Sequence, residues 1–393
     1  MLSFDLPPGK RLLFALRAAL ILLAGVNFAC DGHSNVSPND VTPPSTTRSY
    51  AYITNGVDNT VTSYKVDPST GALSGIGYSA VGRLPSAVVT LHTANGNFLY
   101  VANKDDNTVS QFSINPSGTL SALAPPTVKT GKSPVALLQT RFEEFVYDRI
   151  YVANQVDNSI SIFHVNTDGT LGIVGTSAAN GTGPMKLSIS VSGLHVLNGG
   201  NNTLATFDVV SDAAGGLKAN KTDALVSGIF PTDMIQYDAF FITDSKNNKV
   251  IPYGDELGLT LGKAVTVPKT PVSITFCPNA EAGGLAHGVF VGSSEGAIYQ
   301  YSYNPAVSIT DLQPQTAAPV TFPAQQVVVK AGTSVSYTLY ALLSHSNTVQ
   351  VYTIDGIALN PASVKTTPTG TLPTDIAFAD INISTGDVQT TVK

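Results

Sequence analysis

The sequence predicts an all-β fold: a seven-bladed β-propeller of four-stranded blades, with the first blade closed by the C-terminal strand. Three patterns, each repeated seven times along the 393 residues, support this prediction. An opening strand that often contains tyrosine recurs, an aromatic residue recurs at a fixed place after it, and a proline recurs before a short apolar run. A repeat of about 40 to 50 residues is typical of propeller blades.

The first pattern is a strand of the form Tyr-Val-Ala-Asn. Residues 51–55, 99–103 and 150–154 match it closely. Degenerate copies complete the set of seven and start at His195, Phe241, Phe290 and Tyr340. Successive copies are about 44 to 51 residues apart, which is the length expected of one blade. We interpret this pattern as the second strand of each blade, strand B.

The second pattern is an aromatic residue at a fixed position in the strand that follows, strand C. The seven aromatics are Tyr64, Phe112, Phe163, Phe207, Tyr253, Tyr301 and Tyr352. Alternate residues of a strand share one face, so each ring lies with the residues two positions away. We expect that face to pack against the next blade, because large rings fill the gap between stacked sheets.

The third pattern is a proline before a short apolar run. The seven prolines are Pro85, Pro134, Pro184, Pro231, Pro271, Pro323 and Pro373. Proline is tolerated at the first residue of a strand, so each marks the start of the innermost strand, strand A. A Gly-x-Leu turn, such as residues 118–120, leads into the outermost strand, strand D. Pro252 falls inside a strand C and removes a ladder donor, so we expect its blade to be the least regular.

The phase of the repeat predicts how the ring closes. The domain opens at a strand B, at Tyr52, and ends on a lone strand A, residues 373–378. That last strand would complete the first blade and remove the exposed edges of an open sheet. We therefore place the propeller at residues 50–385 and a short tail at residues 386–393.

The N-terminal residues predict export from the cytoplasm. Lys10 and Arg11 precede an apolar run, residues 12–26, that is too short to be a comfortable membrane span. We expect residues 1–29 to be a signal peptide.

The end of this signal resembles the lipobox of bacterial lipoproteins, in which a cysteine after a small residue is acylated. Phe-Ala-Cys stands at residues 28–30, so Cys30 would carry the lipid anchor. Residues 30–49 are rich in Ser, Asn, Pro and Thr and would form a flexible tether. We expect a periplasmic or cell-surface lipoprotein. The alternative is ordinary cleavage near residue 29 and a soluble secreted protein.

Composition argues against several classes of function. Charged residues make up 12% of the chain and the net charge is −6, whereas a general nucleic-acid binder is basic. The two cysteines, Cys30 and Cys277, cannot form a disulfide framework or a cysteine metal cluster. The Asn and Asp residues of the turns lack the ligand order of a calcium loop, and we expect them to serve as left-handed turn residues. We expect a monomer without metal or cofactor.

Residues 95–103, Asn-Gly-Asn-Phe-Leu-Tyr-Val-Ala-Asn, are followed by Asp-Asn-Thr-Val at residues 106–109. This segment resembles the YVTN-type propeller repeat of bacterial and archaeal surface proteins. It also resembles the seven-bladed lactonase family, which includes a class of 6-phosphogluconolactonases. The likeness covers residues 50–380 and implies the propeller fold. Lactonases of this family resemble one another in a Gly-Pro-Arg-His stretch whose histidine faces the channel, but residues 183–186 here are Gly-Pro-Met-Lys.

Two rings of residues near the channel mouth are candidate ligand-binding positions. Two residues after each strand-A proline, the ring is Ala87, Ala136, Lys186, Asp233, Ser273, Gln325 and Asp375. Two residues before it, the ring is Arg83, Lys132, Thr182, Ile229, Lys269, Thr321 and Thr371. The four basic residues would give a positive mouth that attracts an anion, and the two aspartates add carboxylates. The alternative is that Lys186 pairs with Asp233 and the other charges are solvated.

Two functions remain open on the sequence alone. The first is a non-catalytic scaffold at the cell envelope that binds a partner protein or a small anionic ligand at its mouth. The second is a lactone hydrolase of the 6-phosphogluconolactonase type that uses other residues than the family's histidine. Its candidates are Lys186, Asp233, Asp375 and the turn residue His345, because opening a lactone needs an acid or base near the carbonyl. Convergence of these side chains under a deep pocket would favour the enzyme.

Overall fold

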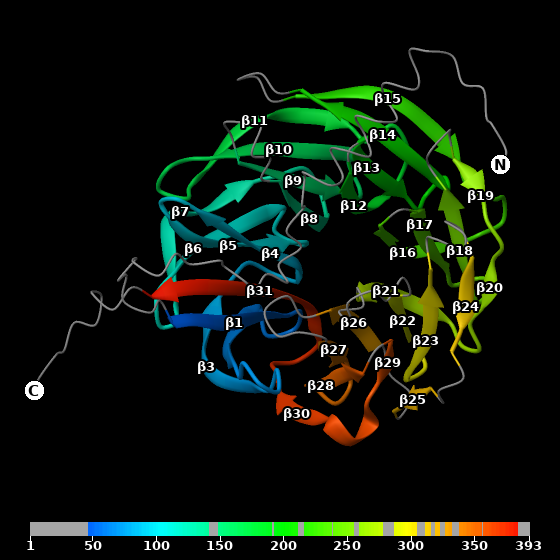
Figure 1. Ribbon diagram of the computed structural model, residues 1–393. Helices are drawn as coiled ribbons and strands as arrows, with labels where there is room; N and C mark the ends of the chain where they lie inside the picture. The colour runs from blue at the N-terminus through cyan, green and yellow to red at the C-terminus, as the bar shows by residue number, and fades with distance from the viewer. Residues whose placement is uncertain are drawn as a thin grey trace, which may run out of the picture. The chain divides into compact units, whose positions relative to one another are not determined.

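Seven antiparallel sheets built from the described residues form a ring, and each sheet is one blade (Figure 1). The computed structural model describes residues 46–140, 148–190, 192–210, 216–237, 239–254, 259–277, 287–304, 311–315, 319–322, 327–331, 338–355 and 357–383. The expected signal peptide (residues 1–29), Cys30, most of the expected tether (residues 30–49) and the tail (residues 386–393) lie outside these ranges. No helix within them is long and apolar enough to span a membrane.

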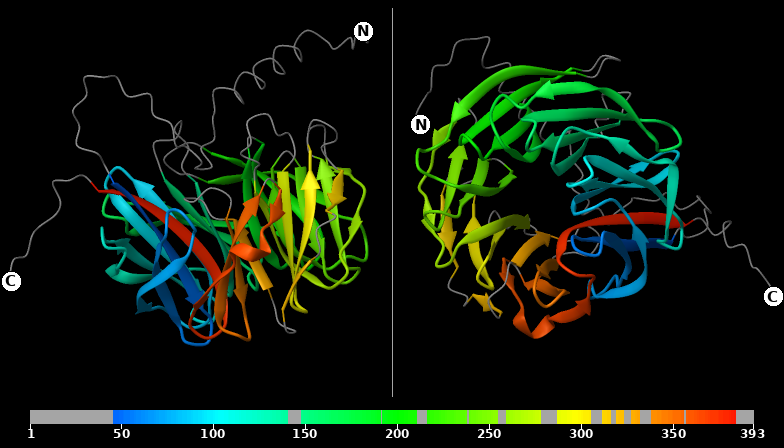
Figure 2. Two further views of the ribbon diagram at one scale, coloured as in Figure 1. Left: turned by 60° about the horizontal axis from the view of Figure 1, so that its bottom comes forward. Right: turned by 180° about the vertical axis from the view of Figure 1, so that it is seen from behind.

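Strand A of each blade lies nearest the centre of the ring, and strand B pairs with it (Figures 1 and 2). In the order of blades 1 to 7, strands A are β31 (Pro373–Ile383), β4 (Pro85–Thr93), β8 (Pro134–Thr140), β12 (Pro184–Ser190), β16 (Pro231–Gln236), β21 (Pro271–Cys277) and β26 (Val327–Ala331). In the same order, strands B are β1 (Thr46–Asn55), β5 (Gly96–Asn103), β9 (Arg149–Asn154), β13 (Gly193–Asn198), β17 (Ala239–Asp244), β22 (His287–Ser293) and β27 (Thr338–Leu343).

Strand C follows strand B, and strand D forms the rim. Strands C are β2 (Thr60–Val66), β6 (Thr108–Ile114), β10 (Ser159–Val165), β14 (Thr203–Val209), β18 (Lys249–Gly254), β23 (Ala297–Tyr303) and β28 (Thr348–Asp355). Blades 1 to 4 have one continuous strand D each: β3 (Leu73–Ala80), β7 (Leu120–Lys129), β11 (Leu171–Ala178) and β15 (Leu217–Ala224).

In blades 5 to 7, strand D is split into two short pieces. The pieces are β19 (Thr260–Leu261) with β20 (Val265–Thr266), β24 (Leu312–Pro314) with β25 (Val320–Thr321), and β29 (Ala358–Leu359) with β30 (Lys365–Pro368); the 3₁₀ helix η1 (Pro361–Ser363) precedes β30.

The blade that contains Pro252 was expected to be the least regular, but two other blades are irregular in the same way. The outer strand breaks opposite Pro252 in blade 5, but blades 6 and 7 break at the matching place without a proline. In blades 1 to 4 the same place carries a register shift close to the strand-C aromatic, as between Ser63 and Tyr64. The irregularity therefore belongs to the position beside the aromatic, where bulges bend the outer strand, and not to proline alone.

The C-terminal strand closes the ring, as the phase of the repeat predicts. β31 pairs antiparallel with β1 from Thr46 opposite Ile383 to Asn55 opposite Pro373 (Figure 1). The strand is longer than the expected residues 373–378, because β1 also extends back to Thr46. Pairing these two strands joins the first and last parts of the propeller and covers the edge of β1 that would otherwise be open.

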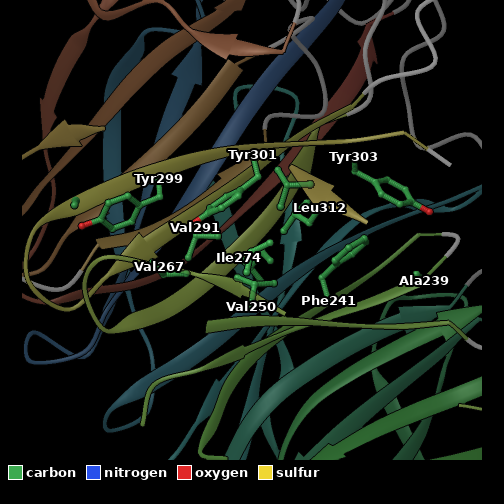
Figure 3. Close-up of a cluster of buried hydrophobic side chains, with 13 residues drawn as sticks. Ala239, Phe241, Val250, Val267, Ile274, Val291, Tyr299, Tyr301, Tyr303 and Leu312 are labelled. Atoms are coloured by element: carbon green, nitrogen blue, oxygen red, sulfur yellow. The ribbon is translucent and has the colours of Figure 1, made fainter. Parts of the chain in front are cut away.

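The hydrophobic core of the described residues lies in seven clusters, one between each pair of neighbouring blades. Each cluster contains one of the seven predicted strand-C aromatics, which confirms that these side chains fill the space between blades. Figure 3 shows the cluster between blades 5 and 6, where Tyr301 lies with Phe241 and Val250. The neighbour was predicted wrongly, however. Phe112 of blade 2 packs with Tyr52 of blade 1, so the aromatic side chain of strand C faces the preceding blade.

The tyrosine of strand B and the glycine of the Gly-x-Leu turn are bonded to each other across blades. The Tyr100 hydroxyl donates to the Gly169 carbonyl of the next blade at 2.7 Å, and Tyr52 donates to Gly118 at 3.0 Å. Both glycines have φ of +82°, a left-handed conformation that other residues adopt at a cost. These two motifs are therefore two halves of one contact, which Tyr340 also makes with Gly71 at 2.9 Å.

Candidate site at the centre of the ring

Six of the seven predicted prolines are the first residue of a strand A. The seventh, Pro323, lies outside the described residues. In these six strands a register shift follows the proline, as between Pro184 and Lys186. The residue after the proline bulges out of the ladder, and the residue two after it resumes pairing. A bulge re-aims side chains, so it sets the direction of the predicted ring of residues.

Bulge hydroxyls link three of the described inner strands to the strand A of the next blade. Thr374 donates to the Pro85 carbonyl at 2.8 Å, and Thr232 donates to the Pro271 carbonyl at 3.0 Å. Ser86 makes the same contact with blade 3 at 2.8 Å. Unpaired backbone groups on the inner edge of a blade are thereby satisfied by the side chains of its neighbour.

The two aspartates of the ring also bond to the following blade, but as acceptors of its backbone N–H groups. Asp375 Oδ2 accepts the Val88 N–H at 3.1 Å, and Asp233 Oδ2 accepts the Ile274 N–H at 3.0 Å. Part of their role is therefore structural. These bonds also hold each carboxylate in one orientation, because the backbone donor is itself fixed in a strand.

Lys186 of blade 4 reaches across to Asp233 of blade 5. Its Nζ lies 3.0 Å from Asp233 Oδ1, and the two side chains are 36% and 10% exposed. Burial alone would lower the pKa of Lys186, but the Asp233 and Asp375 carboxylates and the bond to Asp233 raise it above its usual value. Asp375 belongs to blade 1 and acts on Lys186 through its charge, whereas Asp233 contacts Lys186 directly. We call Lys186, Asp233 and Asp375 the central triad.

The ring positions beside the triad are small. Blades 2 and 3, which lie between Asp375 and Lys186 in blade order, present only the methyl groups of Ala87 and Ala136. Ser273 of blade 6 uses its hydroxyl to accept the Val329 N–H at 3.1 Å and is buried. Gln325 lies outside the described residues.

The charged residues of the second predicted ring lie in loops that lead into strands A, and Arg83 and Lys269 meet partners from the turns. Arg83 Nε lies 2.6 Å from Asp106 Oδ1, and Lys269 Nζ donates to the Glu295 carbonyl at 3.1 Å. Lys132 is exposed, and its backbone N–H donates to Asp157. The turns thus offset part of the positive charge expected at the mouth.

The asparagines of the turns between strands B and C act as the left-handed turn residues that the sequence predicts. Asn107 has φ of 55° and accepts the Ser133 N–H at 2.8 Å; Asn158 has φ of 52° and accepts the Gly183 N–H at 2.7 Å. Each bond holds the residue just before a strand-A proline of the next blade. Among the described residues, no group of three or more His, Cys, Asp or Glu is arranged to hold a metal ion.

His345 is exposed in the turn between β27 and β28 of blade 7. The structure therefore places the fourth candidate on a turn, whereas the three members of the central triad lie on inner strands. His195 lies in β13, as predicted, and lines a pocket that the sequence did not reveal. The Ser-x-Ser-x-x-His spacing of residues 190–195 is the signal that could have pointed to it.

Comparison with known proteins agrees with this architecture. The sequence model of the family described as lactonase, 7-bladed beta-propeller, matches residues 43–138. No curated protein matches the sequence. The structure is similar to that of a putative 6-phosphogluconolactonase from Bacteroides fragilis, with 18% identity, 88% of this chain and 100% of that chain covered, and a TM-score of 0.66.

Two further solved structures are similar. One is the periplasmic gluconolactonase PpgL of Pseudomonas aeruginosa, with 14% identity, 85% and 99% coverage and a TM-score of 0.64. The other is a protein from Lactobacillus plantarum, with 15% identity, 85% and 100% coverage and a TM-score of 0.65. At these identities the likeness concerns the fold. Together with the family match over residues 43–138, it confirms that the chain is a lactonase-like seven-bladed β-propeller.

Proposed function

We propose that this propeller hydrolyses lactones at the central triad. The observation that carries the proposal is the position of the Lys186 ammonium, 3.0 Å from Asp233 and close enough to Asp375 for both carboxylates to act on it. A cation and carboxylates from different blades are therefore brought together on the inner strands. Such a pair matches the needs of ester hydrolysis, which are a donor for the carbonyl oxygen and a base for water.

The three side chains take separate roles in this proposal. Lys186 donates a hydrogen bond to the lactone carbonyl and stabilises the negative charge that develops on its oxygen. Asp375 accepts a proton from the attacking water, whose oxygen bonds to the carbonyl carbon. The ring C–O bond then breaks, and the same proton passes to the alkoxide that leaves. Asp233 positions Lys186 and keeps it protonated.

The substrate class is proposed from the fold neighbours and the charge of the site. A putative 6-phosphogluconolactonase and a periplasmic gluconolactonase share the architecture. Lys186 stands where the resembling family has its histidine, and its raised pKa keeps it positive throughout the neutral range. Every lactone opens to a hydroxy carboxylate, and a fixed positive charge at the site attracts that product anion.

The test is hydrolysis of a panel of γ- and δ-lactones of sugar acids by the purified protein, measured by acid release at constant pH. We expect turnover above the buffer rate, and a loss of about 100-fold in kcat/KM for Asp375→Asn and for Lys186→Met. The Asn variant can still accept the Val88 N–H, so its fold is retained. Asp380→Asn is the matched control, because Asp380 lies on the same strand and bonds to Ser49. Turnover that is equal in all variants would refute the site.

A binding scaffold is the second candidate function. It is favoured by the structural bonds of both carboxylates and by the absence of histidine from the ring positions that the structure describes. In that case no lactone is turned over, yet D-gluconate binds, and Lys186→Met weakens that binding. Isothermal titration calorimetry with D-gluconate separates the two functions.

Export and lipid anchoring through Cys30 complete the proposal and rest on the sequence of residues 1–49. An acylated Cys30 and the tether would hold the propeller at the cell envelope. Mass spectrometry of the mature N-terminus tests this, with Cys30→Ser as the control. An unmodified N-terminus at any residue other than Cys30 would leave a soluble secreted protein.

A further inference from the structure

A pocket lies between blades 4 and 5, away from the central triad. Its volume is about 70 Å³, and its walls come from β13, β14, β15 and β17. Leu204, Phe240 and Leu259 form an apolar side, and Ser192, His195 and Lys221 supply polar groups. This volume is well below the ~300–1,000 Å³ of pockets for drug-sized ligands, so a short acyl group fits it better than a sugar lactone.

His195 is the centre of the polar groups. Its ring is 2% exposed and meets the Phe240 ring edge-on, with 4.8 Å between the centroids. Its Nε2 lies 2.9 Å from Ser190 Oγ and 3.1 Å from Ser192 Oγ, and its Nδ1 lies 3.1 Å from Thr206 Oγ1. With the proton on Nδ1, Thr206 accepts it and Nε2 can accept a serine hydroxyl. A hydroxyl beside a base that a third group orients is the arrangement of an activated nucleophile.

Ser192 is the more accessible of the two serines. It is exposed and lines the pocket, whereas Ser190 is half-buried and accepts the Ser192 backbone N–H at 3.1 Å. Burial, and then the charge of Lys221, lower the pKa of His195 to about 4. The imidazole is therefore neutral at pH 7, and the ring nitrogen without a proton can accept a hydrogen bond from a hydroxyl.

We propose that Ser192 and His195 form a second reactive site, an acyl-transfer site for esters of short-chain carboxylic acids. The Ser192 Oγ attacks the ester carbonyl carbon, and its proton moves to His195 Nε2. The bond to the alkoxy oxygen breaks, and the alcohol leaves with the proton from Nε2. Water then attacks the acyl-serine in the same way, which releases the carboxylic acid and restores both side chains.

Two neighbours support this chemistry. Lys221, whose Nζ lies 3.1 Å from Asp223 Oδ2, brings a positive charge to the pocket where the carbonyl oxygen becomes negative. Thr206 is a positioning residue, because its hydroxyl fixes the ring orientation without touching the ester. None of the residues that line the pocket belongs to the central triad, and of the groups bonded to His195 only Ser190 lies on a strand A, at the end of β12.

The test uses the full-length protein with a fluorophosphonate probe and with p-nitrophenyl acetate. We expect the probe to add to Ser192, located by peptide mass spectrometry, and an initial burst of p-nitrophenol. Ser192→Ala should abolish both, and His195→Gln should slow labelling about 100-fold. Thr206→Val should slow labelling and Thr206→Ser should restore it. Ser177→Ala is the matched control, since Ser177 is a half-buried serine outside the pocket that bonds to the Ala178 carbonyl.

Circular dichroism of each variant checks that the fold is intact. Asp375→Asn should leave the labelling of Ser192 unchanged, so that a failure of the lactonase proposal does not affect this one. Labelling of Ser190 or of another residue would overturn the assignment. An unlabelled wild-type protein, or equal labelling of wild type and Ser192→Ala, would overturn the site itself.

Discussion

Acid should destabilise this protein through His195. The unfolded chain binds a proton on a histidine near pH 6.5, whereas burial and Lys221 lower the pKa of His195 in the folded protein to about 4. Stability from this group is therefore complete above pH 6.5 and is lost as the pH falls toward 4. The linkage relation gives a loss of about 2 kcal/mol between pH 7 and pH 5, and about 3 kcal/mol by pH 4. Two charged residues line the same pocket, Lys221 and Asp223, and they form an ion pair.

Urea unfolding at a series of pH values between 7 and 4.5 measures this loss as a change in the free energy of unfolding. His195→Gln keeps polar groups beside Ser192 and Thr206 but cannot titrate. We expect the variant to be less stable at pH 7 and to depend less steeply on pH, so that the two curves converge toward pH 5. Parallel curves for the two proteins would refute the assignment of the acid sensitivity to His195.

The remaining predictions concern the contacts that hold the blades together and are all measured by urea unfolding at pH 7. Tyr100→Phe should lower the free energy of unfolding by about 1–3 kcal/mol, because it removes the donor to the buried Gly169 carbonyl. Tyr78→Phe is the control and should leave the free energy of unfolding unchanged, because Tyr78 is exposed. Gly118→Ala should lower the free energy of unfolding by about 2 kcal/mol or more, because Gly118 has φ of +82° and an added Cβ would overlap the Tyr50 ring. Gly75→Ala is the control, because an added Cβ there meets no atom within 4 Å. Asp233→Ala should be less stable than Asp233→Asn by about 1–3 kcal/mol, because Asn can still accept the Ile274 N–H; equal stabilities would show that this bond contributes little.

The repeated features of the fold could be predicted because each pattern recurs seven times in the sequence. The strand-A prolines begin strands, the strand-C aromatics lie in the interblade clusters, and β31 closes blade 1. The neighbour of each aromatic could not be predicted, because period-2 alternation shows which residues share a face but not which blade that face meets. The bond between Tyr100 and Gly169 was hidden for the same reason: both motifs were visible, but their contact crosses 69 residues.

The site could be predicted only in part. The spacing after the prolines led to Lys186, Asp233 and Asp375, which the structure brings under one electrostatic influence. Their bonds to Val88 and Ile274 depend on the bulges and were not visible in the sequence. The pocket at His195 was missed because its walls come from two blades, and only the serines near His195 carry a local signal in the sequence.

The central claim is that Asp375 and Lys186 open lactones at the centre of the ring. The most direct measurement is the ratio of kcat/KM for glucono-δ-lactone between the wild-type protein and Asp375→Asn at pH 7, corrected for the buffer rate. A ratio of about 100 or more, with Asp380→Asn equal to wild type, is the predicted result. A ratio near one, or no turnover above buffer in the wild type, would contradict the claim.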